Sequence, residues 1–158
     1  MLGRGLLAAA LVAALDQIGK AWILGFFAAD AAGTQVAVTP FFNLVLTWNR
    51  GMSFGLFNNA AALNTVVFTA LAAIIVTGLI VWLRRVDQLL LAVAIGLVIG
   101  GAVGNVIDRL WRGAVVDFLD FHLAGWHFYV FNLADAAISV GVGLMLLDSL
   151  LVQRRAPN

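Results

Sequence analysis

Four long apolar stretches constrain the fold most strongly, because a run of about 20 apolar residues is what a helix needs to cross a membrane. They lie at about 3–27, 60–83, 89–108 and 131–152. Each stretch is long enough for one crossing, and turn-forming or charged residues separate them. The sequence therefore predicts an all-α membrane protein with four transmembrane helices.

The first stretch has a second interpretation. Arg4 followed by the short apolar run 5–15 is similar to a secretory signal peptide. However, the apolar run resumes after Lys20 and continues to Phe27, which gives the whole segment the length of a spanning helix. We therefore expect a retained transmembrane helix here.

The overall composition agrees with a membrane protein. Of the 158 residues, 63% are hydrophobic and 11% are charged, and the mean hydropathy is +1.04. Soluble domains have about 45–50% apolar and about 25% charged residues. We expect a single domain, 1–158, with no nucleic-acid partner at a net charge of +1. The absence of cysteine excludes disulfides, thiolate nucleophiles and cysteine-ligated zinc.

The arginines predict the orientation in the membrane. Both chain ends and the 84–88 loop hold Arg4, Arg84, Arg85, Arg154 and Arg155. The other connecting segments hold Arg50, Arg109 and Arg112. Positive charge is enriched in cytoplasmic loops, so both termini are expected in the cytoplasm and the segments 28–59 and 109–130 outside.

The segment 28–59 differs in kind from the apolar stretches. Residues 35–39 alternate polar and apolar side chains, and residues 43–48 are rich in β-formers. Pro40 separates these two runs, and a glycine-rich turn follows them. We expect a small extracytoplasmic β-cradle from 34–57 lying on the membrane surface, and an outer loop over 109–130.

Polar residues concentrate between residues 100 and 138, which hold four of the eight acidic residues and both histidines. Burying an unpaired carboxylate is costly, so each aspartate needs a partner or a function. Asp16, outside this segment, lies four residues before Lys20 and shares a helix face with it. Asp108 is next to Arg109 and four residues before Arg112, which indicates a structural ion pair. Asp120 has no obvious partner, and we expect a solvated loop charge.

Two aspartates remain, and both map to the outer membrane boundary. Asp117 is flanked by apolar residues, with no adjacent cation. Asp135 lies one turn into the last apolar stretch, where Asn132 is a candidate helix cap and the helix dipole favours an anion. A structural role for Asp135 is therefore one interpretation. The other is catalytic: two close carboxylates share a proton, so one takes a proton from water while the other polarises a carbonyl group.

Five sequence motifs, in order along nearly the whole chain, resemble the lipoprotein signal peptidases (signal peptidase II) of bacteria. They are Asp16-Gln17-x-x-Lys20, Asn49-Arg50-Gly51-x-x-Phe54-Gly55, Gly100-Gly101-Ala102-x-Gly104-Asn105-x-Ile107-Asp108-Arg109, Val115-Val116-Asp117-Phe118, and Phe131-Asn132-x-Ala134-Asp135. The chain departs from the family pattern at none of these matched positions. Together the five motifs are far more specific than any one of them.

The resemblance implies a membrane-embedded aspartic endopeptidase that removes signal peptides from prolipoproteins, cleaving before the diacylglyceryl-modified cysteine. It implies Asp117 and Asp135 as the catalytic pair, without a metal or cofactor. It assigns supporting or substrate-binding roles to Asp16, Lys20, Asn49, Gly51, Gly101, Asn105, Asp108, Arg109 and Asn132. The implied setting is the inner membrane, with the active site near the outer face. The implied partners are membrane lipids and globomycin-type inhibitors, and we expect a monomer.

Three other functions compete with this hypothesis. A serine peptidase would use Ser53 with Lys20 as the base, but Lys20 already has Asp16 as a partner. A metal site would use Asp117, His122 and His127, whose spacing matches no helical ligand motif. A small ion- or proton-coupled transporter would spread its charges through the bilayer depth. Here the charges gather at one face, which favours chemistry at the membrane surface.

Overall fold

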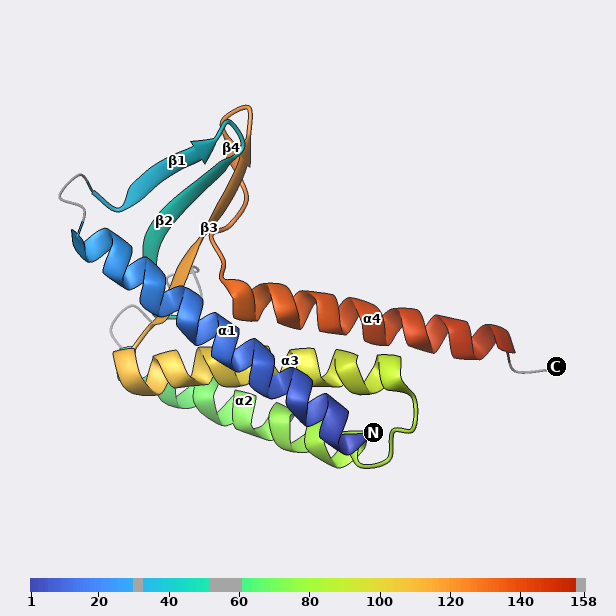
Figure 1. Ribbon diagram of the computed structural model, residues 1–158. Helices are drawn as coiled ribbons and strands as arrows, with labels where there is room; N and C mark the ends of the chain where they lie inside the picture. The colour runs from blue at the N-terminus through green and yellow to red at the C-terminus, as the bar shows by residue number, and fades with distance from the viewer. Residues whose placement is uncertain (30–32, 52–60, 156–158) are drawn as a thin grey trace.

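The computed structural model describes residues 1–29, 33–51 and 61–155, in which four long helices carry a small sheet at one end (Figure 1). The helices are α1 (Leu2–Ala29), α2 (Ala61–Leu83), α3 (Leu89–Arg112) and α4 (Leu133–Arg155). Each contains a segment long and apolar enough to cross a membrane. The predicted four-helix architecture is confirmed, although α3 continues to Arg112, beyond its expected end at 108.

Helix α3 is the centre of the bundle and packs against the other three helices. One apolar cluster joins it to α1 and α2 through Ala9, Leu83, Val86, Ala92, Ile95 and Ile99. Two glycines of α3 allow a close approach. A Cβ on Gly104 would lie 2.6 Å from Asp16 Oδ2, and a Cβ on Gly101 would collide with the carbonyl oxygen of Ala134. Small residues therefore bring α1 and the start of α4 against the polar end of α3.

The sheet is antiparallel, in the order β1-β2-β3-β4, and its strands come from two distant parts of the chain. They are β1 (Gln35–Thr39), β2 (Phe42–Asn49), β3 (Val115–Leu123) and β4 (Trp126–His127). The strands expected within the 34–57 cradle are confirmed by β1 and β2, whereas residues 52–57 lie outside the described residues.

The segment 109–130, expected to be an outer loop, instead supplies β3 and β4. Its physical reason is burial: Val116 and Phe118 of β3 pack against Ile23 and Phe27 near the end of α1. A loop that buries its backbone must satisfy its amide groups, and pairing with β2 does this. The sheet is therefore attached to the bundle by its own apolar core.

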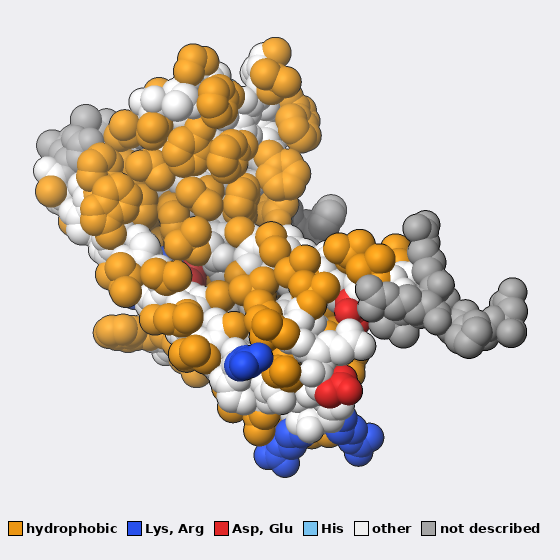
Figure 2. Space-filling view, turned by 45° about the vertical axis from the view of Figure 1, so that its right-hand side comes forward, with side chains coloured by type: hydrophobic (Ala, Val, Ile, Leu, Met, Phe, Trp, Pro, Cys, Tyr) orange, Lys and Arg blue, Asp and Glu red, His pale blue; other side chains and the backbone are white. Residues whose placement is uncertain are grey.

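The molecule has two different ends. The sheet stands where α1 and α3 end and where α4 begins, while the N-terminus and the C-terminal end of α4 lie at the opposite end (Figure 1). Hydrophobic side chains cover most of the face in Figure 2, and Lys and Arg side chains gather at the end away from the sheet. Large apolar side chains of the helices, such as Leu15, Ile74 and Leu146, are more than half exposed. Such a surface suits contact with lipid.

Candidate active site

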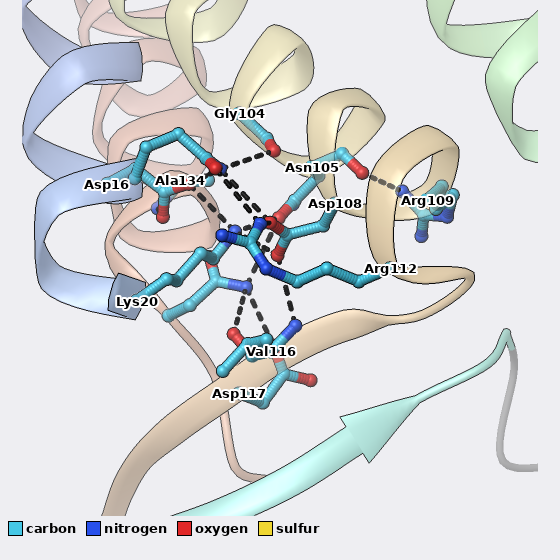
Figure 3. A network of polar contacts seen from close by, with 12 residues as sticks. Asp16, Lys20, Gly104, Asn105, Asp108, Arg109, Arg112, Val116, Asp117 and Ala134 are labelled. Carbon is cyan, nitrogen blue, oxygen red and sulfur yellow. Dashed lines mark hydrogen bonds and ion pairs between the residues drawn. The ribbon is translucent and has the colours of Figure 1, made fainter. Parts of the chain in front are cut away.

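Four charged side chains form a buried cluster, which we call the charged network: Asp16, Lys20, Asp108 and Arg112 (Figure 3). Lys20 Nζ lies 2.7 Å from Asp16 Oδ2 and 2.8 Å from Asp108 Oδ2, and all three side chains are fully buried. Arg112 pairs with the other oxygen of Asp108. The predicted pairs Asp16–Lys20 and Asp108–Arg112 are confirmed, and Lys20 joins them into one network.

The charged network also holds the backbone of two other elements. Asp108 Oδ2 accepts a hydrogen bond of 3.1 Å from the backbone N–H of Val116 in β3. Asp16 Oδ1 accepts one of 3.0 Å from the backbone N–H of Ala134 in α4. Val116 and Ala134 immediately precede Asp117 and Asp135 in the chain. The network therefore fixes the backbone next to both candidate catalytic aspartates.

Asp117 is buried, and the described residues that hold its side chain do so through amide groups. Its Oδ1 accepts a hydrogen bond of 2.7 Å from Asn132 Nδ2, and its Oδ2 accepts one of 3.0 Å from Asn49 Nδ2. Burial, assisted by the charge of Asp135, raises the pKa of Asp117 to about 6, even though the hydrogen bonds from Asn49 and Asn132 act in the opposite direction. Asp117 is thus a carboxyl group that can hold a proton near neutral pH.

Asp135 lies in the first turn of α4 and is also held by amides. Its Oδ1 accepts a hydrogen bond of 2.8 Å from Asn105 Nδ2, and its Oδ2 accepts one of 3.3 Å from the backbone N–H of Asn132. In turn, Asn132 Oδ1 accepts a hydrogen bond of 2.9 Å from the backbone N–H of Asp135. The two bonds together form a reciprocal helix cap. The predicted cap is confirmed.

Asn132 connects the two aspartates directly. Its side-chain nitrogen donates to Asp117 and its backbone nitrogen donates to Asp135, and the residue is fully buried. Asn105 joins the same group, because its Oδ1 accepts from Lys20 Nζ at 3.0 Å and from Asn132 Nδ2 at 3.2 Å. Asp117 and Asp135, 18 positions apart in the sequence, therefore both accept hydrogen bonds from Asn132. We call these two aspartates the amide-held pair.

Local turns orient the remaining partners. Gly113 ends α3 with φ 75° and redirects the chain into β3, a backbone conformation that favours glycine. The backbone N–H of Gly51 donates to Asn49 Oδ1 at 3.0 Å. This contact fixes which end of the Asn49 amide is the oxygen, so its nitrogen faces Asp117.

Arg109 and Tyr129 lie beside the amide-held pair. The Arg109 guanidinium donates to the carbonyl oxygen of Asn105 at 3.3 Å and lies over the ring of Phe68, 5.2 Å from its centroid. The ion pair predicted for Asp108 forms with Arg112 rather than with the adjacent Arg109, and Lys20 binds the other oxygen of Asp108. Burial, followed by the charges of Asp135 and Asp117, raises the pKa of Tyr129. Sequence reasoning gave no sign of Tyr129.

The expectation that Asp120 is a solvated loop charge is wrong. Its side chain is 5% exposed, and it accepts hydrogen bonds of 2.8 Å from Asn43 Nδ2 and 2.9 Å from His127 Nδ1. Burial raises the pKa of Asp120, but the hydrogen bonds from Asn43 and His127 outweigh burial and hold it below the ordinary value. The partners come from β2 and from beyond the β3 turn, so nothing local indicated them.

Gln17 is a second residue whose role the sequence did not reveal, although it stands inside the first motif. Its Nε2 donates to Asp108 Oδ1 and to the carbonyl oxygen of Gly104, both at 3.1 Å, and its Oε1 accepts from Arg112 at 3.0 Å. Gln17 therefore completes the hydrogen bonding around the charged network. The motif alone was the signal that pointed to it.

The competing sites fare differently. Ser53 lies outside the described residues, and Lys20 is engaged by two carboxylates. Across residues 1–29, 33–51 and 61–155, no group of three or more His, Cys, Asp or Glu side chains is placed to hold a metal ion. His127 contacts Asp120 rather than Asp117, and its ring stacks on His122.

Comparison with known proteins decides the family. The model of the family described as signal peptidase (SPase) II, Peptidase_A8, matches residues 8–151. The chain belongs to the signal peptidase II family. It is 47% identical over 155 residues to a lipoprotein signal peptidase of Methylorubrum extorquens, covering 98% of this chain and 90% of the relative. It is 50% identical over 142 residues to one of Burkholderia vietnamiensis, covering 89% and 83%.

A solved structure agrees with this assignment. A bacterial membrane enzyme determined by the in meso method at 2.3 Å resolution superposes with a TM-score of 0.80 and 31% sequence identity, covering 99% of this chain and 93% of that one. As a signal peptidase II, the chain is a multi-pass bacterial membrane enzyme and an aspartic peptidase. The transporter alternative is thereby set aside.

Proposed function

We propose that this signal peptidase II cleaves prolipoproteins immediately before a diacylglyceryl-modified cysteine, and that Asp117 and Asp135 are its catalytic residues. The observation that carries the proposal is the bridging position of Asn132, which donates to both carboxylates. If Asp135 had only a structural role, the helix cap would be sufficient. That role would not require Asp117, a second carboxyl group, to be buried and hydrogen-bonded to the same asparagine.

In this mechanism the pair carries one shared proton, and Asp117 is the member that holds it because its pKa is raised to about 6. Ionised Asp135 takes a proton from a water molecule whose oxygen attacks the scissile carbonyl carbon. Asp117 donates its proton to the carbonyl oxygen, which gives a neutral tetrahedral intermediate. Asp135 then protonates the leaving nitrogen as the C–N bond breaks, and the proton of the new carboxyl group returns to Asp117.

The neighbouring residues position the pair. Asn49, oriented by Gly51, and Asn132 hold Asp117, while Asn105 holds Asp135. The charged network fixes the backbone on both sides through Asp16 and Asp108. Gly101 supports the site by letting α4 approach α3. Arg109, whose charge acts on both catalytic aspartates, is suited to binding a carbonyl group of the substrate.

The location of the pair explains why lipid would be recognised. Asp117 belongs to β3 and Asp135 to the first turn of α4. Both elements meet at the end of the bundle that carries the sheet (Figure 1), which is the level expected for a membrane interface. A substrate anchored in the same leaflet holds its scissile bond at this depth, and each buried methylene contributes about 0.8 kcal/mol. We place both termini in the cytoplasm and the site near the outer face. We further propose that the enzyme acts as a monomer and binds globomycin-type lipopeptides.

A direct comparison of substrates tests this function. Purified enzyme in detergent would be incubated with one prolipoprotein in its lipidated and unlipidated forms, and kcat/KM measured for each. We expect efficient cleavage of the lipidated form before the modified cysteine and little cleavage of the other. Equal rates for the two forms would overturn the proposed recognition of lipid.

A further inference from the structure

Arg109 is held differently from the other cations near the site. Lys20 and Arg112 each pair with a buried carboxylate, whereas Arg109 forms no ion pair with any residue that the structure describes. Its one hydrogen bond to those residues goes to the carbonyl oxygen of Asn105, at 3.3 Å. In Figure 3 its side chain lies apart from the charged network. A guanidinium group has five N–H donors, so the described residues leave most of them available.

Arg109 nevertheless lies beside the amide-held pair. Asn105 accepts from Arg109 through its backbone, and through its side chain it donates to Asp135 Oδ1 at 2.8 Å. The negative charges of Asp135 and Asp117 both act on the Arg109 guanidinium. The cation is therefore near the pair without forming an ion pair with either carboxylate. Direct pairing would favour ionisation of both aspartates and so oppose the sharing of a proton.

An aromatic ring supplies a second restraint on Arg109. The guanidinium carbon lies over the ring of Phe68, 5.2 Å from its centroid. Phe68 belongs to α2 and is half-buried. The face of an aromatic ring attracts a cation through its quadrupole but carries no net charge. Phe68 can therefore hold the guanidinium without neutralising it, just as the asparagine amides hold Asp117 and Asp135 without neutralising them.

We propose that Phe68 is a positioning residue, whose ring fixes the Arg109 guanidinium beside the amide-held pair so that its available N–H groups bind a carbonyl oxygen of the substrate. The two restraints act on different parts of the group, because the hydrogen bond to Asn105 holds one nitrogen and the ring holds the guanidinium from one side. The inference rests on the proposed function, in which Arg109 contacts the substrate. It gives α2 a part in building the site.

A series of fluorinated phenylalanines at position 68 tests the interaction itself. Each fluorine draws electron density from the ring and weakens its attraction for a cation, while the shape of the side chain changes little. With a lipidated precursor, kcat/KM should fall stepwise from Phe to trifluoro-Phe, by about two- to thirtyfold in total. Equal rates across the series would overturn the role of the ring.

The matched control for this series is the same set of fluorinated residues at position 26. The ring of Phe26 contacts the rings of Trp22 and Phe27, and no cation lies over it among the described residues. Fluorination there should leave kcat/KM unchanged. An equal fall at both positions would show a general effect of fluorine on the protein and would overturn the inference.

A double-mutant cycle shows whether the ring acts through Arg109. Phe68→Leu should lower kcat/KM by about two- to thirtyfold in the unmodified enzyme. It should have no further effect in Arg109→Gln, assayed at raised enzyme concentration, because the cation is already absent. Phe68→Tyr keeps the aromatic face and should retain most of the activity. An equal loss from Phe68→Leu in both backgrounds, or a Tyr variant as impaired as the Leu variant, would overturn the positioning role.

A second aromatic residue gives a control for loss of a ring near an arginine. Trp111 has its ring 5.1 Å from the Arg112 guanidinium, but Arg112 is also held by the carboxylate of Asp108. Trp111→Leu should therefore leave kcat/KM unchanged, and a loss as large as that of Phe68→Leu would count against the inference. Absence of cleavage by the unmodified enzyme would instead overturn the proposed function.

Discussion

The charged network and the amide-held pair are neighbours made of the same residue type, yet their partners differ. Asp16 and Asp108 each form ion pairs with Lys20, and Asp108 also pairs with Arg112. Asp117 and Asp135 accept side-chain hydrogen bonds only from neutral asparagine amides among the described residues. Both groups lie near the same end of the bundle, and each is buried except for one half-buried member, Arg112 in the network and Asp135 in the pair, so position alone does not distinguish them.

This difference in partners shows how one fold can distinguish carboxylates that support the structure from carboxylates that can take part in catalysis. A cation bound directly to a carboxylate favours its ionised form and holds the elements that carry it. A neutral amide orients a carboxyl group without supplying a compensating charge, so burial and the second carboxylate favour retention of a proton. The charged network can therefore serve as a support, and the amide-held pair can exchange protons.

The largest expected effect is the loss of catalytic activity when either aspartate of the amide-held pair is replaced. Asp117→Asn and Asp135→Asn should each lower kcat/KM by at least about 1,000-fold, because a shared-proton pair fails when either carboxyl group becomes an amide. Both variants should still fold, since an asparagine keeps one acceptor oxygen. Cleavage assays with lipidated substrate measure the effect. Asp120→Asn is the control, with a much milder loss, and substantial turnover by either catalytic variant would contradict the assignment.

A large loss of stability should appear on the side of the charged network. Lys20→Met leaves Asp16 without a cation and should lower the free energy of unfolding by about 3–5 kcal/mol. The double variant Asp16→Asn with Lys20→Met should lose less than the sum of the two single variants, because removing both partners leaves neither charge of this pair uncompensated. Unfolding in detergent measures this. Additive losses would show that the two residues act separately.

A smaller effect on stability, opposite in sign to that of Lys20→Met, should distinguish the amide-held pair from the charged network. The pKa of Asp117 is about 6 in the folded protein, above the unfolded value of about 4, so wild-type stability should fall as pH rises between these values. Asp117→Asn lacks this fall, so its free energy of unfolding relative to wild type should rise by about 2–3 kcal/mol between pH 4 and pH 8. Unfolding measured at these two pH values checks the prediction. A difference between variant and wild type that is the same at pH 4 and pH 8 would refute it.

The smallest expected effect is a shift in the pH dependence of kcat/KM, which tests the role of the amide groups that hold Asp117. If Asp117 must be protonated, kcat/KM falls above an apparent pKa near 6. The Asn49 hydrogen bond lowers that pKa, so Asn49→Ala should move the fall to higher pH. Asn43→Ala removes the same group from the same strand but contacts Asp120, so its profile should stay in place. A shift in both variants, or in neither, would argue against the role of Asn49.

The helices, the Asp16–Lys20 ion pair and the cap of α4 were predictable from the sequence for identifiable reasons. Apolar length determines the spans, and the i, i+4 spacing of Asp16 and Lys20 determines their pairing. The positions of Asn132 and Asp135 likewise indicated the helix cap that the structure contains. In each case the interaction is local in sequence, so a short window contains both partners.

The missed features depend on contacts between distant segments. Asp120 has one partner, Asn43, that comes from β2, 77 positions away, and its other partner, His127, reaches it only once β3 and β4 pair. The strands at 115–127 were expected as a loop, although Val115, Val116 and Phe118 are β-formers that a closer pattern analysis would have favoured as a strand. The role of Lys20 as a link between Asp16 and Asp108 required knowledge of how α1 and α3 pack.

The central claim is that Asp117 and Asp135 form one coupled titrating pair, and the infrared absorption of protonated carboxyl groups tests it most directly. The spectrum would be followed over pH 4 to 8 in wild type, Asp117→Asn and Asp135→Asn. We expect a carboxyl band that titrates near pH 6 in wild type and is missing from that pH range in Asp117→Asn. In Asp135→Asn it should titrate at lower pH, because burial still raises the pKa of Asp117 but the charge of Asp135 no longer adds to it. A band that still titrates near pH 6 in Asp117→Asn, or that titrates identically without Asp135, would contradict the coupled pair.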